Sequence, residues 1–340
     1  MAILIDQIVG HAAVIGHLAQ MQMMGRWPHA LLFVGPSGIG KKKLALAAVQ
    51  SLLCEKNQSG APPLKPLAAC GECSSCIRVE KKQSENLIWL APTEGTVKPS
   101  IKVESIRDIL EKLSLSNAGR PRAVVIEDAH TMNPQASNTL LKTLEEPFEN
   151  VYFILMGLEL NQFLPTIRSR TQVVRFSNLS LEEAKKIHPG LADWAYANAR
   201  GQMDRLNSLS SSVGSERRLE AFGFLEQFCF DQNFLKDNEW RNFAKDRTWS
   251  YAVISYWLGM IRDVLYFKNN NRSLILNSDL LEKYKAFEVL ANDQLIDLAT
   301  ELSLAELEIS SYVEPILVFE NLWVKYSRNG TENERQHELS

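Results

Sequence analysis

The chain has 340 residues, of which 45% are hydrophobic and 23% are charged, and its formal net charge is -3. This composition is ordinary for a globular protein of two or three domains. The small net charge excludes a global basic field, so any contact with nucleic acid must use a local patch. No apolar run approaches the ~20 residues that a membrane helix needs, and the first residues lack the features of a signal peptide. We therefore expect a cytoplasmic protein.

Short apolar runs alternate with helical patterns through the first half of the chain. Five runs are predicted as buried strands: 30–34, 87–90, 123–126, 151–155 and 173–176. Helical spacing predicts one helix before the first strand, 12–25, and three between strands, 44–53, 101–113 and 133–146. Asn133 and Pro134 suit the start of the last helix, and Pro147 must end it. This alternation predicts an α/β parallel sheet with right-handed crossovers.

The pattern becomes helical after Phe176. Ser180 begins a capping box, and Ser208 to Gly214 is the candidate linker. Helices are then predicted over 219–230, 249–267, 278–291 and 293–326. The last of these should break near Pro315. We expect an α/β domain, a small helical domain, a larger helical domain and a disordered polar tail, over 1–176, 177–210, 215–327 and 328–340.

A glycine-rich loop with the sequence GPSGIGKK follows the first predicted strand. It satisfies the pattern G-x-x-x-x-G-K, in which backbone N–H groups and the lysine hold phosphate at a helix N-terminus. The residues predicted to do so are Gly35, Gly38, Gly40 and Lys41. The next position normally offers a hydroxyl to Mg²⁺, but Lys42 has no lone pair. We expect phosphate binding without efficient hydrolysis; the alternative is a glycine turn without a ligand.

An acidic pair, Glu127 and Asp128, follows the predicted strand over 123–126. A P-loop ATPase keeps its Mg²⁺ carboxylate and its water-orienting residue at this place, usually as Asp and then Glu. Here the order is reversed, which shifts both the metal geometry and the water position. The alternative is an acidic turn with no catalytic role.

Four of the five cysteines fall between residues 54 and 76. Cys54, Cys70, Cys73 and Cys76 supply two overlapping C-x-x-C steps and one remote thiolate. Four thiolates suit a closed tetrahedral site, and the sequence predicts structural Zn²⁺ there. The alternative is a group of reduced thiols around a loop. Cys229 lies among phenylalanines and is interpreted as a core thiol.

Two arginines, Arg168 and Arg170, flank Ser169 just before the last predicted strand. Arginines at this place suit an arginine finger that reaches the phosphates bound by a neighbouring subunit. The alternative is a pair of surface arginines.

Several motifs occur together and in order over residues 1–176. Besides the glycine loop, they are GH (10–11), PHALLF (28–33), CGxCxxC (70–76), NTLLKTLEEP (138–147) and IRSR (167–170). Together they resemble the AAA+ clamp-loader family of bacterial DNA polymerase III. The resemblance implies a RecA-like α/β P-loop domain with a zinc-binding insertion over 54–76, a small helical lid and an all-helical C-terminal collar. It also implies a five-subunit ring that loads a sliding clamp onto primed DNA.

Two members of that family fit, the gamma/tau motor subunit and the delta-prime subunit. Relative to the motor, the chain is altered at four places that bind or sense nucleotide: Lys42, Glu127-Asp128, Glu159 and Asp204. Arg205 lies one residue past the place of the motor's lid arginine, about 100° round a helix. The departures favour a delta-prime-like stator that no longer hydrolyses ATP.

The family's Ser-Arg motif survives as Ser169 and Arg170, which implies that Arg170 acts in trans on ATP held by a gamma/tau neighbour. We expect gamma/tau and delta subunits as partners in a hetero-pentamer, joined through residues from about 215 onward. Two alternatives stay open. One is an active gamma/tau-like motor that works through Lys41 and Asp128, and the other is a P-loop scaffold outside replication.

Overall fold

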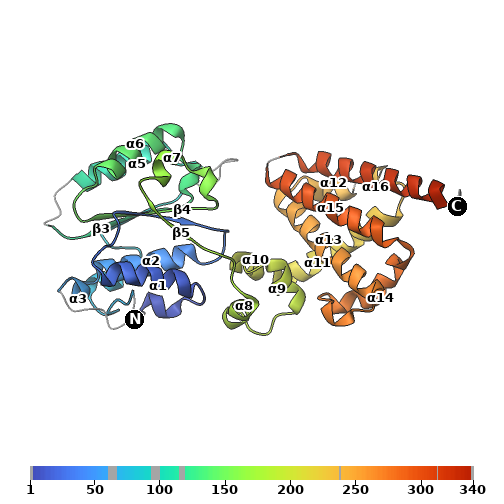
Figure 1. Cartoon of the computed structure of the whole chain (residues 1–340), viewed down its shortest axis with the longest axis horizontal. Coiled ribbons are helices and arrows are strands. Elements are labelled where there is room, and N and C mark those ends of the chain that lie inside the picture. The colour runs from blue at the N-terminus through green and yellow to red at the C-terminus, as the bar shows by residue number, and fades with distance from the viewer. Residues whose placement is uncertain are drawn as a thin grey trace. The chain divides into compact units, whose positions relative to one another are not determined.

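The computed structural model describes residues 3–59, 67–92, 100–114, 119–236, 239–311 and 313–337. The chain divides into two compact units (Figure 1). The first unit holds Met1–Pro189 with Gly201–Asp204, and the second holds Gly190–Arg200 with Arg205–Ser340. Among the described residues, no helix combines the length and the apolar character that crossing a membrane requires.

A five-stranded parallel sheet forms the centre of the first unit. Its strands are ordered β2-β3-β4-β1-β5, so β1 lies between β4 and β5. The bounds are Ala30–Val34 for β1, Leu87–Leu90 for β2, Arg122–Ile126 for β3, Val151–Gly157 for β4 and Gln172–Arg175 for β5. All five predicted strands are confirmed; β4 extends two residues further than expected. Because every pair is parallel, all carboxyl ends lie at one edge of the sheet.

Helices cover both faces of this sheet (Figure 1). On one face lie α1 (Ala12–Met23) and α2 (Lys41–Leu53), and on the other lie α5 (Val103–Ser114) and α6 (Pro134–Glu145). The Asn133 side chain accepts a hydrogen bond from the backbone N–H of Ala136 and caps α6 as predicted.

Side chains that alternate along β1 enter two separate cores. Leu31 and Phe33 pack with the α1–α2 layer, whereas Leu32 and Val34 pack with the α5–α6 layer. Every residue of β1 is buried. The uninterrupted apolar run is therefore required, because neither face of the strand meets water.

Short elements complete the first unit. A 3₁₀ turn, η1 (Leu4–Gln7), precedes α1, and the cysteine segment carries α3 (Glu55–Gln58) and α4 (Ser74–Glu80). The other short elements are η2 (Ala129–Thr131), η3 (Leu160–Gln162), α7 (Pro165–Arg168) and α8 (Leu181–Ile187). The predicted capping box at Ser180 is present at the start of α8, where Glu183 completes it.

Apart from residues 203 and 204 of α10, the helices that follow α8 belong to the second unit. They are α9 (Asp193–Ala199), α10 (Met203–Leu209), α11 (Ser212–Phe230), α12 (Glu239–Ala244), α13 (Arg247–Lys268), α14 (Leu281–Tyr284), α15 (Asn292–Ser310) and α16 (Pro315–His337). The central α13 buries Trp257 completely, and its indole N–H donates to the Ala221 carbonyl at 2.7 Å. The break near Pro315 is confirmed.

Three expectations for this half of the chain need comment. The linker candidate is mostly helical, because α11 already begins at Ser212 and only residues 210 and 211 separate it from α10. The helix predicted over 278–291 is confirmed in part. Helical turns run from 278 to 289, but only α14 among them is α-helical and the rest are 3₁₀ turns. Buried Tyr284 and Phe287, three residues apart, both contact Phe222. Helix α16 continues to His337, residues 338–340 lie outside the described residues, and the disordered tail stays a prediction.

Candidate functional site

The glycine loop joins the buried strand β1 to the first turn of α2. Gly35 is required there, because a Cβ atom would lie 2.5 Å from the Phe176 carbonyl oxygen. Gly40 adopts φ +101 immediately before α2, a backbone conformation that favours glycine. His11 also contacts the loop: its Nε2 lies 2.7 Å from the Ile39 carbonyl oxygen, so Nε2 must carry the proton and donate. The strand–loop–helix context expected of a P-loop is present.

Lys41, the predicted phosphate ligand, is turned back onto its own loop. Its ammonium donates to the Gly35 carbonyl at 2.5 Å and also to the Pro36 carbonyl. Burial lowers the pKa of Lys41 to about 8, although the negative charge of Asp128 opposes that shift. A phosphate would have to replace these carbonyls as the partner of the ammonium.

Lys42 and Glu127 form an ion pair that the sequence did not reveal. Glu127 is 7% exposed, and its second carboxylate oxygen accepts a hydrogen bond from the Trp89 indole N–H at 2.5 Å. Burial lowers the pKa of Lys42, but the hydrogen bond and charge of Glu127 outweigh it, so the pKa is raised. The residue that replaced the Mg²⁺-binding hydroxyl is thus neutralised by the first carboxylate after β3.

Asp128 turns the chain away from β3 in a left-handed conformation, with φ 43. Its carbonyl accepts from the Thr131 backbone N–H and hydroxyl, both at 2.8 Å. His130 follows, half-buried, and its Nδ1 has no hydrogen-bond partner within the described part of the chain; burial lowers its pKa despite the charge of Asp128. Neither His130 nor Trp89 was singled out from the sequence. From the sequence, Trp89 indicated only a strand because it is apolar. The parallel register of β2 and β3 is what brings Trp89 close to Glu127.

A carboxylate lies directly against the glycine loop. The Met203 backbone N–H donates to the Gly38 carbonyl at 2.7 Å, and a Cβ atom at Gly38 would lie 2.9 Å from the Asp204 carboxylate. This negative charge would repel phosphate. In the second unit, the Arg205 guanidinium donates to the Ser255 hydroxyl, lies 5.7 Å from the Tyr251 ring, and has its pKa lowered by burial.

Glu159, the altered sensor position, is exposed at the start of η3. Its backbone N–H donates to the Gln162 side-chain oxygen at 3.3 Å, within a capping box. The residue therefore has a local structural partner.

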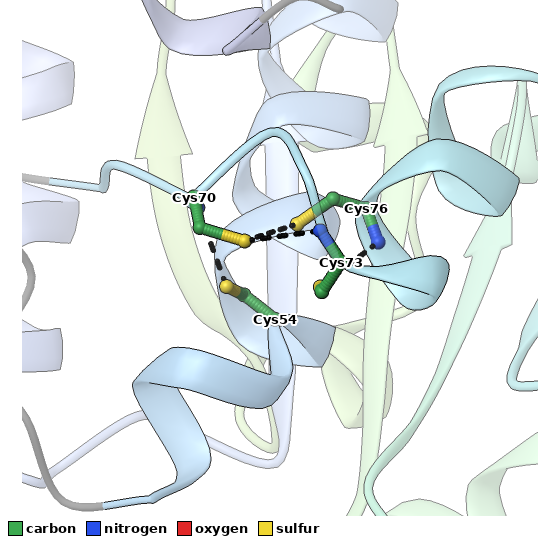
Figure 2. Close-up of side chains that lie close together, drawn as sticks. All are labelled: Cys54, Cys70, Cys73 and Cys76. Atoms are coloured by element: carbon green, nitrogen blue, oxygen red, sulfur yellow. Dashed lines mark hydrogen bonds between the residues drawn. The ribbon is translucent and has the colours of Figure 1, made fainter.

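The four predicted zinc ligands lie together (Figure 2). Cys54 follows α2, Cys70 lies in the loop before α4, Cys73 caps α4, and Cys76 lies in its first turn. All four sulfur atoms lie within 4.8 Å of one another, and the sulfurs of Cys70 and Cys76 are 3.8 Å apart. All are free thiols.

This geometry fits a tetrahedral metal. Four thiolates bound to Zn²⁺ at about 2.3 Å lie about 3.8 Å from one another, so only small side-chain adjustments are needed. Backbone N–H groups of residues 70, 73 and 76 already donate to the sulfurs of Cys54, Cys70 and Cys73. Burial raises the pKa of Cys70, but hydrogen bonds from the Glu72 and Cys73 backbones outweigh it and lower that pKa to about 7. A low thiol pKa favours the metal-binding thiolate at Cys70, whereas burial raises the pKa of Cys73 and of Cys76.

The cysteine cluster is tied to the helix that begins at the glycine loop. The Gln50 side chain of α2 donates to the Cys76 carbonyl at 3.3 Å, and Cys54 directly follows that helix. Lys56 and Glu72 form an exposed ion pair of 3.1 Å across the cluster. Cys229 lies elsewhere, in the second unit on α11, where burial raises its pKa to about 12 despite a hydrogen bond with Tyr326.

Arg170 lies just after α7, at the rim of a surface pocket of about 560 Å³. Its side chain is 34% exposed and forms a 2.7 Å ion pair with Glu145 at the end of α6. A second guanidinium nitrogen donates to the Thr166 carbonyl and the Ser169 hydroxyl, each at 3.2 Å. Glu145 was not singled out from the sequence, because nothing in its spacing links it to Arg170.

The chain is similar to subunits of bacterial DNA polymerase III. A family model described as "DNA polymerase III, delta subunit" matches residues 10–180. The DNA polymerase III subunit tau of Escherichia coli is 32% identical over 179 residues, which cover 52% of this chain and 26% of that protein. The subunit delta' of Pseudomonas aeruginosa is 36% identical over 143 residues, 42% of this chain and 41% of that protein. This chain thus spans less than half of these two relatives.

A longer match is the subunit delta' of Bacillus subtilis, 26% identical over 283 residues, with 80% of this chain and 82% of that protein covered. Among solved structures, a DNA polymerase III gamma subunit-related protein from Thermotoga maritima covers 92% of this chain at 14% identity and a TM-score of 0.46. The family model matches half of the chain, from the loop before α1 to the start of α8. This chain therefore belongs to the DNA polymerase III delta subunit family of clamp-loader proteins.

Proposed function

We propose that this chain is a delta-prime-like stator of the DNA polymerase III clamp loader, whose own P-loop does not hydrolyse ATP. The observation that supports it most strongly is the ion pair between Lys42 and Glu127. Hydrolysis at a P-loop requires Mg²⁺ held by a hydroxyl and a carboxylate. Here an ammonium stands in place of the hydroxyl and neutralises the Glu127 carboxylate, so the hydroxyl is missing and this carboxylate is already paired.

Two further contacts support the same conclusion. Lys41 donates to the loop carbonyls of Gly35 and Pro36, and Asp204 places a negative charge against Gly38. Any ATP held by Gly35, Gly38, Gly40 and Lys41 would have to displace these contacts, and it would remain a static ligand. The cytoplasmic location expected from the sequence stays a prediction.

Arg170 and Ser169 are proposed to serve a neighbouring gamma/tau subunit. An arginine finger must be reachable from outside the chain and must hold a charge that meets the developing negative charge of a phosphoryl group. Arg170 is 34% exposed and is held near the protein surface by its contacts with Thr166, Ser169 and Glu145. The proposed partners are gamma/tau and delta subunits in a hetero-pentamer, which would place a sliding clamp on primed DNA.

The cysteine cluster is proposed to hold one structural Zn²⁺. Four thiolates would fill every position of a tetrahedral ion and leave none for a substrate, which is typical of structural sites. The bound metal would join the end of α2 to α4 and so brace the helix that starts at the glycine loop. Its role would be stability and not chemistry.

The experiment is an ATPase measurement on the purified chain and on the complex reconstituted with gamma/tau and delta subunits. We expect the chain alone to show no turnover above that of its Lys41→Ala variant, and we expect it to co-purify with the partner subunits. Turnover by the chain alone that Lys41→Ala abolishes would overturn the stator and support the motor.

The motor remains the second candidate because a tau subunit is among the similar proteins, at 32% identity over 179 residues. It would have to work with Lys41 and Asp128, and Lys42 would have to release Glu127. Failure of the chain to join the loader subunits would instead support a P-loop scaffold outside replication.

A further inference from the structure

Arg170 lies beside the C-terminal ends of two helices. Helix α6 ends at Glu145, and α7 ends at Arg168, one residue before Ser169. The negative ends of both helices favour a cation there. Glu145 adds a full negative charge, and one of its carboxylate oxygens lies 2.7 Å from Nη2 of Arg170. Glu145 and Ser169 also line the surface pocket that Arg170 borders.

The hydrogen bonds of Arg170 can be counted. A guanidinium has five N–H donors, and here Nη1 donates to the Thr166 carbonyl and the Ser169 hydroxyl, while Nη2 forms an ion pair with Glu145. Nε–H and one Nη2–H therefore have no partner among the described residues. Two donors are left for an anion without any of the existing bonds being broken.

Two sets of contacts hold the Arg170 guanidinium, and they restrict its orientation differently. The contacts with Thr166 and Ser169 hold only one end of the guanidinium, about which the planar group could still pivot. The contact with Glu145 holds the second end and so fixes the plane. The pair itself contributes little to folding, because Glu145 is 50% exposed and solvent screens the charges. Its value lies in the orientation of Arg170.

We propose that Glu145 is a positioning residue, which fixes the Arg170 guanidinium so that its two unpaired donors are ready for the phosphate of ATP bound by a neighbouring subunit. This inference rests on the proposed role of Arg170 and extends it to a residue on another element. Glu145 does not touch the phosphate. It acts only through Arg170, and its negative charge holds the guanidinium in place.

The test uses the reconstituted complex with five forms of this chain besides the wild type: Glu145→Ala, Glu145→Gln, Glu146→Ala, Arg170→Ala and the double variant Glu145→Ala/Arg170→Ala. Glu146→Ala is the matched control, because it removes the same charge from the adjacent exposed residue, for which the structure gives no contact with Arg170. kcat and KM for ATP are measured for each complex. Co-purification and thermal unfolding establish that each variant folds and assembles.

We expect Glu145→Ala to lower the part of kcat that depends on Arg170 by about three- to ten-fold with little change in KM, because a misoriented arginine loses transition-state contacts and not ATP binding. Glu145→Gln keeps the size of the side chain but removes the charge of the ion pair, so it should also lower kcat, and Glu146→Ala should behave as wild type. Adding Glu145→Ala to Arg170→Ala should cause no further loss.

The outcomes separate this inference from the proposed function. If Arg170→Ala leaves turnover unchanged, the arginine finger itself is wrong, and the inference falls with it. If Arg170→Ala lowers turnover but Glu145→Ala does not, only the positioning role is overturned. An equal loss from Glu145→Ala in the wild-type and Arg170→Ala backgrounds would also overturn it, since Glu145 would then act independently of Arg170.

Discussion

Lys42 and Glu127 neutralise each other at the edge of the sheet where a hydrolytic P-loop would hold a metal ion. In the sequence they are two separate departures from the motor pattern. In the structure they are one complementary exchange, in which a lysine and a glutamate replace a hydroxyl and an aspartate. Trp89 donates to the second oxygen of the glutamate and completes the arrangement.

Lys42→Thr should lower the free energy of unfolding by about 1–2 kcal/mol, because it leaves the buried Glu127 carboxylate with Trp89 as its one side-chain partner among the described residues. Lys43→Thr, which alters an exposed neighbouring lysine, should change it by less than about 0.5 kcal/mol. Urea unfolding measures both. If both variants lower the free energy of unfolding by the same amount, the ion pair has no stabilising role. Lys42→Thr alone should not produce ATPase activity, because Glu127 and Asp204 remain.

The buried ammonium of Lys41 should give stability a specific pH dependence. Its pKa is about 8 in the folded chain against an ordinary 10.5, so the unfolded chain binds more protons between these values. Stability contributed by this group is therefore lower below pH 8 and rises as the pH increases from about 8 to about 10.5. Lys41→Met should remove that rise. Unfolding free energies of both forms across this pH range check the sign, and parallel curves would contradict it.

One zinc ion per chain is expected in the native protein, and Cys70→Ser should lower the content to near zero because a tetrahedral structural site needs all four ligands. Metal analysis by mass spectrometry measures the content. Cys229→Ala is the matched control and should keep the metal, since Cys229 lies in the other unit. A strong chelator should lower the unfolding temperature of the wild type and leave that of Cys70→Ser unchanged. A metal-free native protein would contradict the site.

Arg170→Ala should lower ATP turnover at the neighbouring site by roughly 10³-fold, which is the low end of the effect of an arginine finger. The ATPase rate of the whole complex should therefore fall by the part of that rate which this one site contributes. Arg168→Ala removes the same charge two residues earlier and should leave turnover unchanged. Steady-state ATPase assays of the reconstituted complex compare them at equal assembly. Equal losses from both variants would indicate a general effect of surface charge and would argue against the finger.

The strands were predictable because each is a short, uninterrupted apolar run, which a strand covered on both faces requires. The P-loop and the cysteine cluster were predictable because their residues are close in sequence and local geometry brings them together. The 3₁₀ turns within the helix predicted over 278–291 were not predictable, for the opposite reason. The buried Asp263 carboxylate accepts hydrogen bonds from the Asn277 backbone N–H and side chain, each at 2.8 Å, and these tertiary contacts constrain the start of the segment.

The sequence by itself thus determined the sheet, the phosphate-loop shape, the four thiolates and the exposed arginine motif. Only the tertiary structure decided which residues neutralise one another. Lys42 follows β1 and Glu127 follows β3, with β4 between those strands, and they meet because parallel strands bring their carboxyl ends to one edge. The pair formed by Glu145 and Arg170 likewise joins the ends of two helices that the sequence separates. Charges far apart along a chain show their pairing only when packing fixes the distances between them.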